Sequence, residues 1–494
     1  MLLLGIDVGT SSIKVSVVNA DTQQAIVSVQ YPEIETAITS LQPGWAEQSP
    51  EMWWLHVQAA ILKANATKKY NPRDIGAIGI GYQMHGLVLI DKEQQVLRDS
   101  IIWCDSRAVA IGNEAFLHIG EEKCLSHLLN SPGNFTASKL AWVKRNEPGI
   151  YARIHEVLLP GDFIAMKLSG STSTTVSALS EGIFWDFKKQ ALSDDVFGYY
   201  GFDKNLMPVI KNVFEPHGFL KPDVAASLSL KNGIPVSYKA GDQLNNALSL
   251  NVLQPGEIAA TAGTSGVIYS VSDQLGYDKL SRVNSFAHVN HSAEKIRLGI
   301  LLCINGTGIL NNWLRKVTGG HLGYTQMNDA ARKIAPGSDG LFVLPFGNGA
   351  ERMLVNATIQ AHMLNIDLNK HTTAHIYRAG QEGIAFSFRY GLDIMRENGL
   401  VPTVIRAGKA NLFLSDVFAS SFVNATKAPV ELYACDGSVG AAIGAGLGAG
   451  IYKNEKEAFQ HMEKLASIEP EKEALYDELY AQWKELLEEK MKHN

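Results

Sequence analysis

Cysteine is scarce in this chain of 494 residues, and the few cysteines are scattered. The four are Cys104, Cys124, Cys303 and Cys435, and no CxxC pair occurs among them. This usage excludes a disulfide-bonded scaffold and a compact zinc-ribbon site, and it is typical of a reducing cytosol.

Excess positive charge is also lacking, because 44 Lys and Arg stand against 50 Asp and Glu, for a net charge of -6. General nucleic-acid binding is therefore disfavoured.

Long apolar runs are absent as well. The chain opens with Met1-Leu2-Leu3-Leu4-Gly5-Ile6-Asp7, which lacks a basic region and carries an aspartate, unlike a signal peptide. The longest charge-free stretch of small and apolar residues, 437–452, is short and glycine-rich for a membrane span. We expect a cytoplasmic protein with no membrane partner.

The common nucleotide-binding motifs are missing too. No GxxxxGKS/T loop occurs, and no strict GxGxxG follows a strand pattern. The run 440–446 is rich in small residues but has the wrong spacing. We predict that it is a helix packed closely against a sheet, so a protein-kinase or Rossmann assignment gains little support.

What the chain does contain is enough apolar sequence for large cores. Hydrophobic residues make up 46% of it, and at about 150 residues per domain the length predicts two to four domains. Residues 2–8 predict a buried strand, and 13–17 and 25–29 predict the next strands of a meander. Further elements are predicted as a helix over 50–68, strands over 75–82, 87–90 and 101–103, mostly helix over 108–150, and a helix opening at Phe163 after a strand at 157–159.

The second half repeats part of this pattern. Residues 236–240 predict a strand with a helix starting near Leu244, and 258–262 predict a strand that runs into a second Gly-Thr-Ser turn. One such turn in each half indicates a weak internal duplication. We therefore expect an N-terminal domain over 1–246 and a C-terminal domain over 247–494, with the charged segment 455–492 as a solvated helix packed on the latter.

The two turns are Gly9-Thr10-Ser11-Ser12 and Gly263-Thr264-Ser265-Gly266. Glycine lets the backbone approach an anion, successive N–H groups form a nest, and the hydroxyls add donors. A single turn of this kind is also typical of an ordinary hairpin. Two copies favour a pair of lobes that clamp a polyphosphate between them.

Three further positions can carry chemistry. Asp7 lies in an otherwise buried strand, where a carboxylate needs a partner. Mg²⁺ fits a site beside a phosphate nest, and a hydrogen bond to the following turn is the alternative. Asp242 follows a strand end, where it can act as a general base or cap the next helix. Met84 and His85 lie between two apolar strands and can contact a hydroxylated ligand or simply fill a loop, while Trp45, Trp53, Trp54 and Trp103 are interpreted as core or rim residues.

At this point several motifs together resemble one family, the FGGY carbohydrate kinases of the actin/Hsp70/sugar-kinase superfamily. The resemblance covers residues 2–450 and is carried by Gly5 to Ser12, Pro43-Gly44-Trp45-Ala46-Glu47-Gln48, Gln83-Met84-His85-Gly86, Trp103-Cys104-Asp105-Ser106-Arg107, Leu159-Pro160-Gly161-Asp162, Gly241-Asp242, Gly263-Thr264-Ser265 and Glu382-Gly383-Ile384-Ala385-Phe386. The Gln-Met-His-Gly segment is similar to the xylulokinase branch. The resemblance implies an α/β, two-lobed, ribonuclease H-like fold with duplicated domains around an interlobe cleft.

It also implies an activity, the ATP-dependent phosphorylation of a small ketose such as D-xylulose at its terminal hydroxyl. Asp242 would be the general base, and Asp7 would help to hold Mg²⁺. The sugar would contact Met84, His85, Asp242 and Gln243, while Gly9, Thr10, Ser11, Ser12, Gly263, Thr264 and Ser265 would cradle the phosphates. Gly306, Gly308, Gly408 and Asn411 would lie near the adenosine. The implied partners are a sugar and ATP, with a homodimer left open.

Two positions depart from the family pattern. Xylulokinases usually have Asn at the position of Gln243, whereas a glutamine there is more similar to glycerol kinases. This difference leaves ribulose, gluconate, glycerol or a deoxy sugar as alternative substrates. The adenosine-side segment Ala407-Gly408-Lys409 is one glycine short, which leaves nucleotide affinity open. A nucleotide or sugar switch without catalysis, or a catalytically dead relative, are the alternatives outside this enzyme class.

Overall fold

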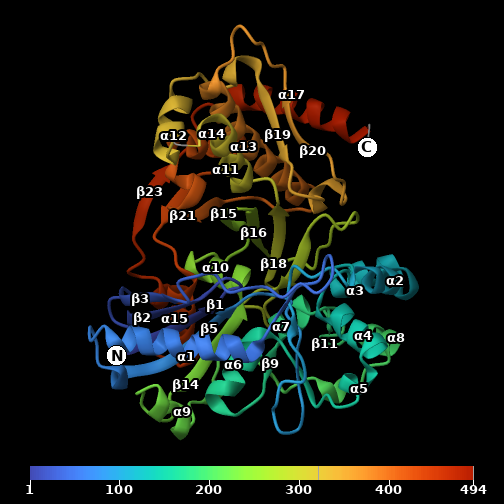
Figure 1. Cartoon of the computed structure of the whole chain (residues 1–494), viewed down its shortest axis with the longest axis vertical. Coiled ribbons are helices and arrows are strands. Elements are labelled where there is room, and N and C mark those ends of the chain that lie inside the picture. The colour runs from blue at the N-terminus through green and yellow to red at the C-terminus, as the bar shows by residue number, and fades with distance from the viewer. Residues whose placement is uncertain (321, 493–494) are drawn as a thin grey trace.

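The computed structural model describes residues 1–320 and 322–492, which form two lobes stacked along the long axis (Figure 1). The lower lobe in this view comes mainly from the first half of the chain and the upper lobe mainly from the second. Residues 321 and 493–494, part of the predicted C-terminal domain, lie outside the described residues. None of the helices in the two described ranges is long and apolar enough to cross a bilayer.

The sheet of the lower lobe has six strands in the order β13-β14-β5-β1-β2-β3. They are β1 (Leu2–Val8), β2 (Ile13–Asn19), β3 (Ala25–Tyr31), β5 (Ile75–Tyr82), β13 (Gly218–Phe219) and β14 (Pro235–Gly241). β1, β2 and β3 form an antiparallel meander, whereas β5 pairs parallel with both β1 and β14. The apolar runs predicted as buried strands are thus the centre of this sheet, where both faces are covered.

The sheet of the upper lobe repeats this plan with seven strands in the order β17-β18-β16-β15-β21-β22-β23. They are β15 (Glu257–Ala262), β16 (Gly266–Ser272), β17 (Asn284–Ala287), β18 (Leu298–Ile304), β21 (Val404–Gly408), β22 (Val430–Tyr433) and β23 (Lys464–Ile468). On one side β15 has antiparallel neighbours, and on the other it has two parallel strands and an antiparallel edge, as β1 does. The predicted α/β fold with duplicated domains is confirmed.

Helices cover the faces of both sheets. In the lower lobe α1 (Pro50–Ala66) lies on β2 and β3, and α6 (Pro160–Ser169) lies on β5 and β14. In the upper lobe α13 (Thr373–Glu397) packs on β16, β18 and β19 (Phe342–Phe346), and β19 pairs with β20 (Gln360–Leu364). The helices α11 (Gly308–Gly319), α12 (Tyr324–Arg332), α14 (Asp416–Thr426) and α17 (Glu473–Lys492) pack against α13. Each lobe therefore has its own apolar core.

One helix crosses from the second half of the chain to the first sheet. α15 (Gly437–Gly448) follows β22, yet it packs against β1, β5 and β14 and against α10 (Asp242–Ser249). Small residues make this close approach possible. A Cβ placed on Gly5 would lie 1.8 Å from the Ser438 carbonyl oxygen, and one on Gly79 would lie 2.0 Å from that of Ala441. The predicted helix of small residues packed closely on a sheet is confirmed.

The rest of the lower lobe is a group of short elements inserted between β5 and β14. Its helices are α2 (Val109–Ile119), α3 (Glu121–Leu128), α4 (Thr136–Asn146), α5 (Pro148–Tyr151), α7 (Val176–Glu181), α8 (Asp194–Tyr200) and α9 (Pro222–Ser227). Its short strands are β6 (Val88–Ile90), β7 (Ser100–Ile101), β8 (Glu156–Leu158), β9 (Thr174–Thr175), β10 (Trp185–Asp186), β11 (Ala191–Leu192) and β12 (Ile210–Lys211), and β7 pairs with β4 (Glu47–Gln48). The helical prediction over 108–150 is confirmed.

Three boundaries differ from prediction. α6 begins at Pro160 rather than Phe163, because proline is well suited to the first turn of a helix. The strand expected over 101–103 ends at Ile101, and Trp103 is 53% exposed. The segment 455–492 is not one helix, because α16 (Glu455–Ala458) is followed by β23, which pairs with the open edge of β22.

Candidate active site

Three parallel strands of the first sheet end at one edge, and each is followed by predicted site residues. The register aligns Val8 of β1 and Gly241 of β14 with Tyr82 of β5. The segments that come next are therefore neighbours: Gly9–Ser12, Gln83–His85 and Asp242. In open α/β sheets this edge is where ligands bind.

Asp7 lies one residue before the end of β1, beside the start of α15. A Cβ on Gly437 would lie 2.6 Å from Asp7 Oδ2, and Asn245 Nδ2 donates to the Gly437 carbonyl at 2.8 Å. Burial raises the pKa of Asp7 to about 6; Lys14 opposes this rise and the charge of Asp436 adds to it. No hydrogen bond reaches this carboxylate within residues 1–320 and 322–492, so the expected alternative, a bond to the following turn, is not what the structure has.

These surroundings fit a hard cation. Asp7 and Asp436 place negative charge at one point, and a cation between carboxylates would relieve their repulsion. Among the described residues, no three Asp, Glu, His or Cys side chains converge closely enough to hold a metal alone. Carboxylate oxygens such as those of Asp7 and Asp436 are the ligand type that Mg²⁺ takes, and this cation usually keeps several waters and takes other ligands from substrate phosphates.

Asp242 is the first residue of α10 and is half-buried. Gly241 occupies the N-cap position, and no side-chain cap bond forms, so Asp242 does not serve as the cap. Burial and then the charge of Asp7 raise the pKa of Asp242 to about 7, although hydrogen bonds from Gln243 lower it. A carboxylate with a pKa near neutrality is well matched to general-base work.

Met84 and His85 follow β5, whose end pairs with the end of β14 just before Asp242. The side chain of Met84 is buried, with Cγ 2.6 Å from the point where a Cβ on Gly241 would sit. His85 has a left-handed backbone (φ 63°), and its Nδ1 bonds the Glu181 carbonyl at 3.0 Å. Burial, and then Lys139, lower the pKa of His85 to about 3. The ring is therefore neutral, Nδ1 carries the hydrogen, and Nε2 is a hydrogen-bond acceptor.

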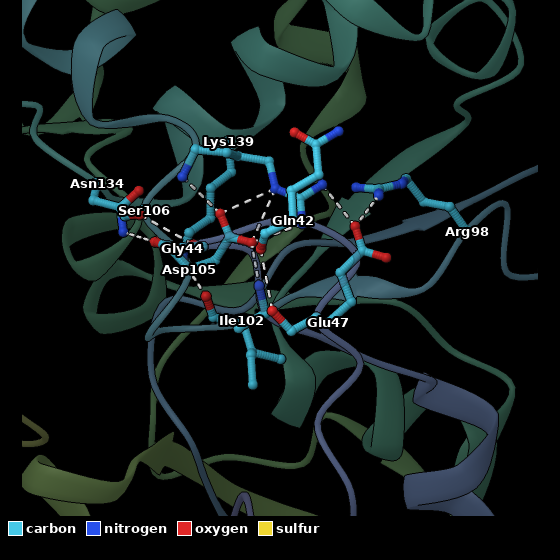
Figure 2. A network of polar contacts seen from close by, with 12 residues as sticks. Gln42, Gly44, Glu47, Arg98, Ile102, Asp105, Ser106, Asn134 and Lys139 are labelled. Atoms are coloured by element: carbon cyan, nitrogen blue, oxygen red, sulfur yellow. Dashed lines mark hydrogen bonds and ion pairs between the residues drawn. The ribbon is translucent and has the colours of Figure 1, made fainter.

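A polar network that includes Glu47, Asp105 and Lys139 lies at the motifs on either side of the site (Figure 2). Lys139 Nζ donates to the carbonyls of His85 at 3.0 Å and Ile102 at 2.9 Å. Asp105 Oδ2 accepts from the Ala46 amide at 2.6 Å, and Arg98 pairs with Glu47 at 2.5 Å. Burial lowers the pKa of Lys139 to about 7, and Asp105 opposes that shift. This network holds the motifs around residues 45 and 105 in one place.

The first Gly-Thr-Ser turn follows the end of β1 at the same edge of the sheet. The Gly9 amide donates to the Ser12 carbonyl at 3.1 Å, and Ser11 is exposed. Thr10 Oγ1 donates to Gln83 Oε1 at 3.1 Å and accepts from Trp103 Nε1 at 2.9 Å. The turn is thus tied to the Gln83 segment, and Trp103, expected in the core or rim, reaches into the site.

The second turn lines a cavity of about 670 Å³ in the upper lobe. The amides of Gly308 and Ile309 donate to the carbonyls of Gly263 at 2.9 Å and Thr264 at 3.0 Å. The cavity lining includes Gly263, Thr264, Gly308, Asn311, Asn312, Tyr324, Asn328, Arg332, Asn411 and Ser415. Its volume suits a ligand of nucleoside size.

Other predicted nucleotide residues lie elsewhere. Gly306 is buried against the Pro345 carbonyl, and its amide donates to Glu351 at 3.2 Å. Gly408 ends β21 close to Cys435, and neither glycine is part of the cavity lining. Ser265 is exposed at the tip of its turn.

Several residues at the site carry no sequence signal. Arg352 reaches from the upper lobe to Ser131 Oγ of the lower lobe at 3.3 Å, and it donates to the Ser281 carbonyl at 2.7 Å. Burial lowers the pKa of Arg352 to about 10. Glu181 lies beneath Gly241. Each is an isolated polar residue in a segment without a motif, so only the folded chain brings it to the site.

Comparisons with known proteins agree with this architecture. The model of the N-terminal domain of the FGGY family of carbohydrate kinases matches residues 2–249. The chain is 28% identical to the xylulose kinase of Escherichia coli (strain K12) over 460 residues, which are 92% of this chain and 91% of that protein. The crystal structure of xylulose kinase from Rhodospirillum rubrum, 25% identical, superposes with a TM-score of 0.88 over 98% of each chain. Gluconate kinase from Lactobacillus acidophilus, 21% identical with a TM-score of 0.88 over 99% of this chain and 98% of that one, shares the fold.

Proposed function

Because the chain belongs to the FGGY family of carbohydrate kinases and is an ATP-dependent sugar kinase, we propose that its acceptor is D-xylulose and its product D-xylulose 5-phosphate. The single observation that carries the proposal is the position of Asp242, half-buried at the strand edge directly after Gly241, against which Met84 packs. The similarity to xylulose kinases over nine-tenths of the chain favours a ketose as acceptor.

In the proposed reaction Asp242 takes the proton of the terminal hydroxyl as the hydroxyl oxygen attacks the γ-phosphorus of ATP. The bond between this phosphorus and the bridging oxygen of the β-phosphate breaks, and ADP leaves. The half-buried carboxylate is ionised above pH 7 and can accept that proton. His85 Nε2 accepts a hydrogen bond from another sugar hydroxyl, and Met84 packs on the carbon chain. Met84, His85, Asp242 and Gln243 would form the sugar site of the lower lobe.

The phosphates would lie between the two Gly-Thr-Ser turns, with the nucleoside in the upper-lobe cavity. Gly9 to Ser12 and Gly263 to Ser265 would direct amides and hydroxyls at the phosphate oxygens. Asp7 would hold Mg²⁺ through water, and the cation would neutralise charge on the phosphates. Gly308 and Asn411 would contact the adenosine. Closure of the lobes would exclude water from the transferring group.

The test is ADP release with Mg²⁺ and ATP, with and without each of five acceptors: D-xylulose, L-xylulose, D-ribulose, gluconate and glycerol. Stimulation by D-xylulose above all others is the expected result. Stronger stimulation by gluconate or glycerol would keep the kinase activity and overturn the ketose assignment, with Gln243 as the first residue to exchange. Silence across the panel with ATP still bound would favour a non-catalytic relative. Cytoplasmic location, the homodimer and the domain boundary at residue 246 stay predictions.

A further inference from the structure

A second carboxyl group lies buried beneath the base. Glu181 is the last residue of α7, and its side chain is 1% exposed. A Cβ on Gly241 would lie only 2.5 Å from Glu181 Oε2, so the carboxyl packs directly on the backbone that precedes Asp242. Neither Glu181 oxygen makes a hydrogen bond of ordinary length within residues 1–320 and 322–492, and the Tyr82 hydroxyl is the hydrogen-bonding group that faces them. A buried carboxyl with such weak hydrogen bonding is costly, so its retention calls for a reason.

Glu181 contacts both His85 and the segment around Gly241 and Met84, which belong to the proposed sugar site. Its main-chain carbonyl bonds His85 Nδ1 at 3.0 Å, and its side chain shares the space under Gly241 with Met84. α7 is itself anchored to the upper lobe, because Ser180 Oγ accepts from the Ala287 amide at 2.9 Å. Glu181 is therefore held by the bond between its carbonyl and His85 and by the anchoring of α7 to the upper lobe.

The two neighbouring carboxyls have different access to water. Asp242 is half-buried and Glu181 is almost fully buried, so a negative charge is less costly on Asp242. Burial and the charge of Asp242 raise the pKa of Glu181 well above its usual range. The titratable groups that face it are Tyr82 on β5, His85, Lys139 on α4, Asp162 on α6, Tyr269 on β16 and Asp242, and Asp162 is already paired with Lys239 at 2.5 Å. Of the two carboxyls, Glu181 therefore favours the proton and Asp242 favours the negative charge.

We propose that Glu181 is a positioning residue for the phosphoryl transfer: its neutral side chain fills the space under Gly241 and keeps water from that side of Asp242, while its carbonyl holds the His85 tautomer. This inference rests on the proposed function, because it assigns the orientation of a base that acts on a sugar hydroxyl. The volume and neutrality of the side chain matter here, and its ionisation does not.

The experiment compares kcat and kcat/KM for the accepted sugar between pH 5 and 9 in the wild type, Glu181→Gln and Glu181→Ala. Glu181→Gln has the same shape without a charge, so we expect kcat within about threefold and an unchanged acid limb. Glu181→Ala leaves a space that water can enter. Its kcat should fall about 10- to 100-fold through loss of orientation, and its acid limb should move down by about one pH unit or more toward the usual aspartate range.

Tyr238→Phe is the matched control. Tyr238 lies on the same strand as Gly241, and its hydroxyl is buried without a partner in the described part of the chain. Its loss should leave the pH profile unchanged. Thermal unfolding shows whether each variant is folded. Calorimetry measures its Kd for ATP, which should lie within about threefold of the wild-type value.

The outcomes separate two failures. A wild type that turns over no sugar refutes the proposed function. An active wild type whose Glu181→Ala variant keeps kcat and the acid limb refutes the positioning role alone. Should Glu181→Ala fail to fold, Glu181→Gln still decides, because a tenfold loss of kcat or a shifted acid limb in that variant would mean that the ionised group itself is needed.

Discussion

The hairpins β1–β2 and β15–β16 occupy the same place in two sheets of the same topology, yet their surroundings differ. The penultimate residue of β1 is Asp7, whereas that of β15 is Thr261. Asp7 lies among Asp436, Gly437 and Asn245 and has a raised pKa. Thr261 Oγ1 accepts a long hydrogen bond from Asn246 Nδ2, at 3.4 Å. One duplicated scaffold thus supplies two Gly-Thr-Ser turns, and the penultimate position of the strand before the turn carries a carboxylate in the first copy and a hydroxyl in the second.

The same contrast extends to the strands next to each hairpin. In the first sheet β5 and β14 lead into His85 and Asp242, to which the proposed function assigns the sugar and the proton. In the second sheet β21 leads into Asn411, which lines the cavity of nucleoside size. Under the proposed function, the lower lobe would handle the proton and the cation, while the upper lobe would hold the nucleotide.

The largest expected effect removes the base. Asp242→Asn should lower kcat by about 10²- to 10⁴-fold while ATP and sugar still bind, because only proton transfer is lost. Turnover within threefold of wild type, measured by ADP release, would contradict the assignment.

The same variant has a stability signature. The pKa of Asp242 is raised from 3.8 to about 7 in the folded state, so its contribution to stability is full below pH 4 and is lost as the pH rises through 7. Asp242→Asn should therefore have a higher Tm than the wild type at pH 8 and a similar Tm at pH 4. Equal differences at both pH values would argue against the raised pKa.

A smaller effect tests the two hairpins against each other. Asp7→Asn should lower activity about 10- to 100-fold at limiting Mg²⁺, with partial recovery at high Mg²⁺, because a group that holds the cation through water is lost. Thr261→Ala, at the matching position of β15, should change activity less than about threefold. A magnesium titration of both variants makes the comparison, and equal losses would remove the distinction between the nests.

The smallest effect on activity comes from the packing of α15. Gly79→Ala places a methyl group 2.0 Å from the Ala441 carbonyl oxygen and should lower the free energy of unfolding by about 1–3 kcal/mol, with kcat nearly kept at low temperature. Gly149→Ala, which meets nothing within 4 Å, is the control. Urea unfolding of both measures the difference, and equal midpoints would show that α15 can shift without cost.

Much of the local structure could be predicted from residue patterns. The runs 2–8 and 75–82 are apolar throughout, so they form buried strands in the predicted places. The prediction of one helix over 455–492 was wrong because β23 is an edge strand of mixed composition, which only its pairing with β22 identifies as a strand. Gly306 was predicted near the adenosine because it is a glycine, but the absence of a side chain there serves its close packing on Pro345.

By itself the sequence determined the strands, the paired Gly-Thr-Ser turns and the residue types that can move a proton or hold a phosphate, because these depend on neighbours along the chain. Only the tertiary structure decided that α15 lies on the sheet of the other half, that Asp436 stands beside Asp7 and that Glu181 lies beneath Gly241. Those contacts join residues far apart in the chain, and the pKa of each carboxyl is set by the groups and the water around it in the folded state.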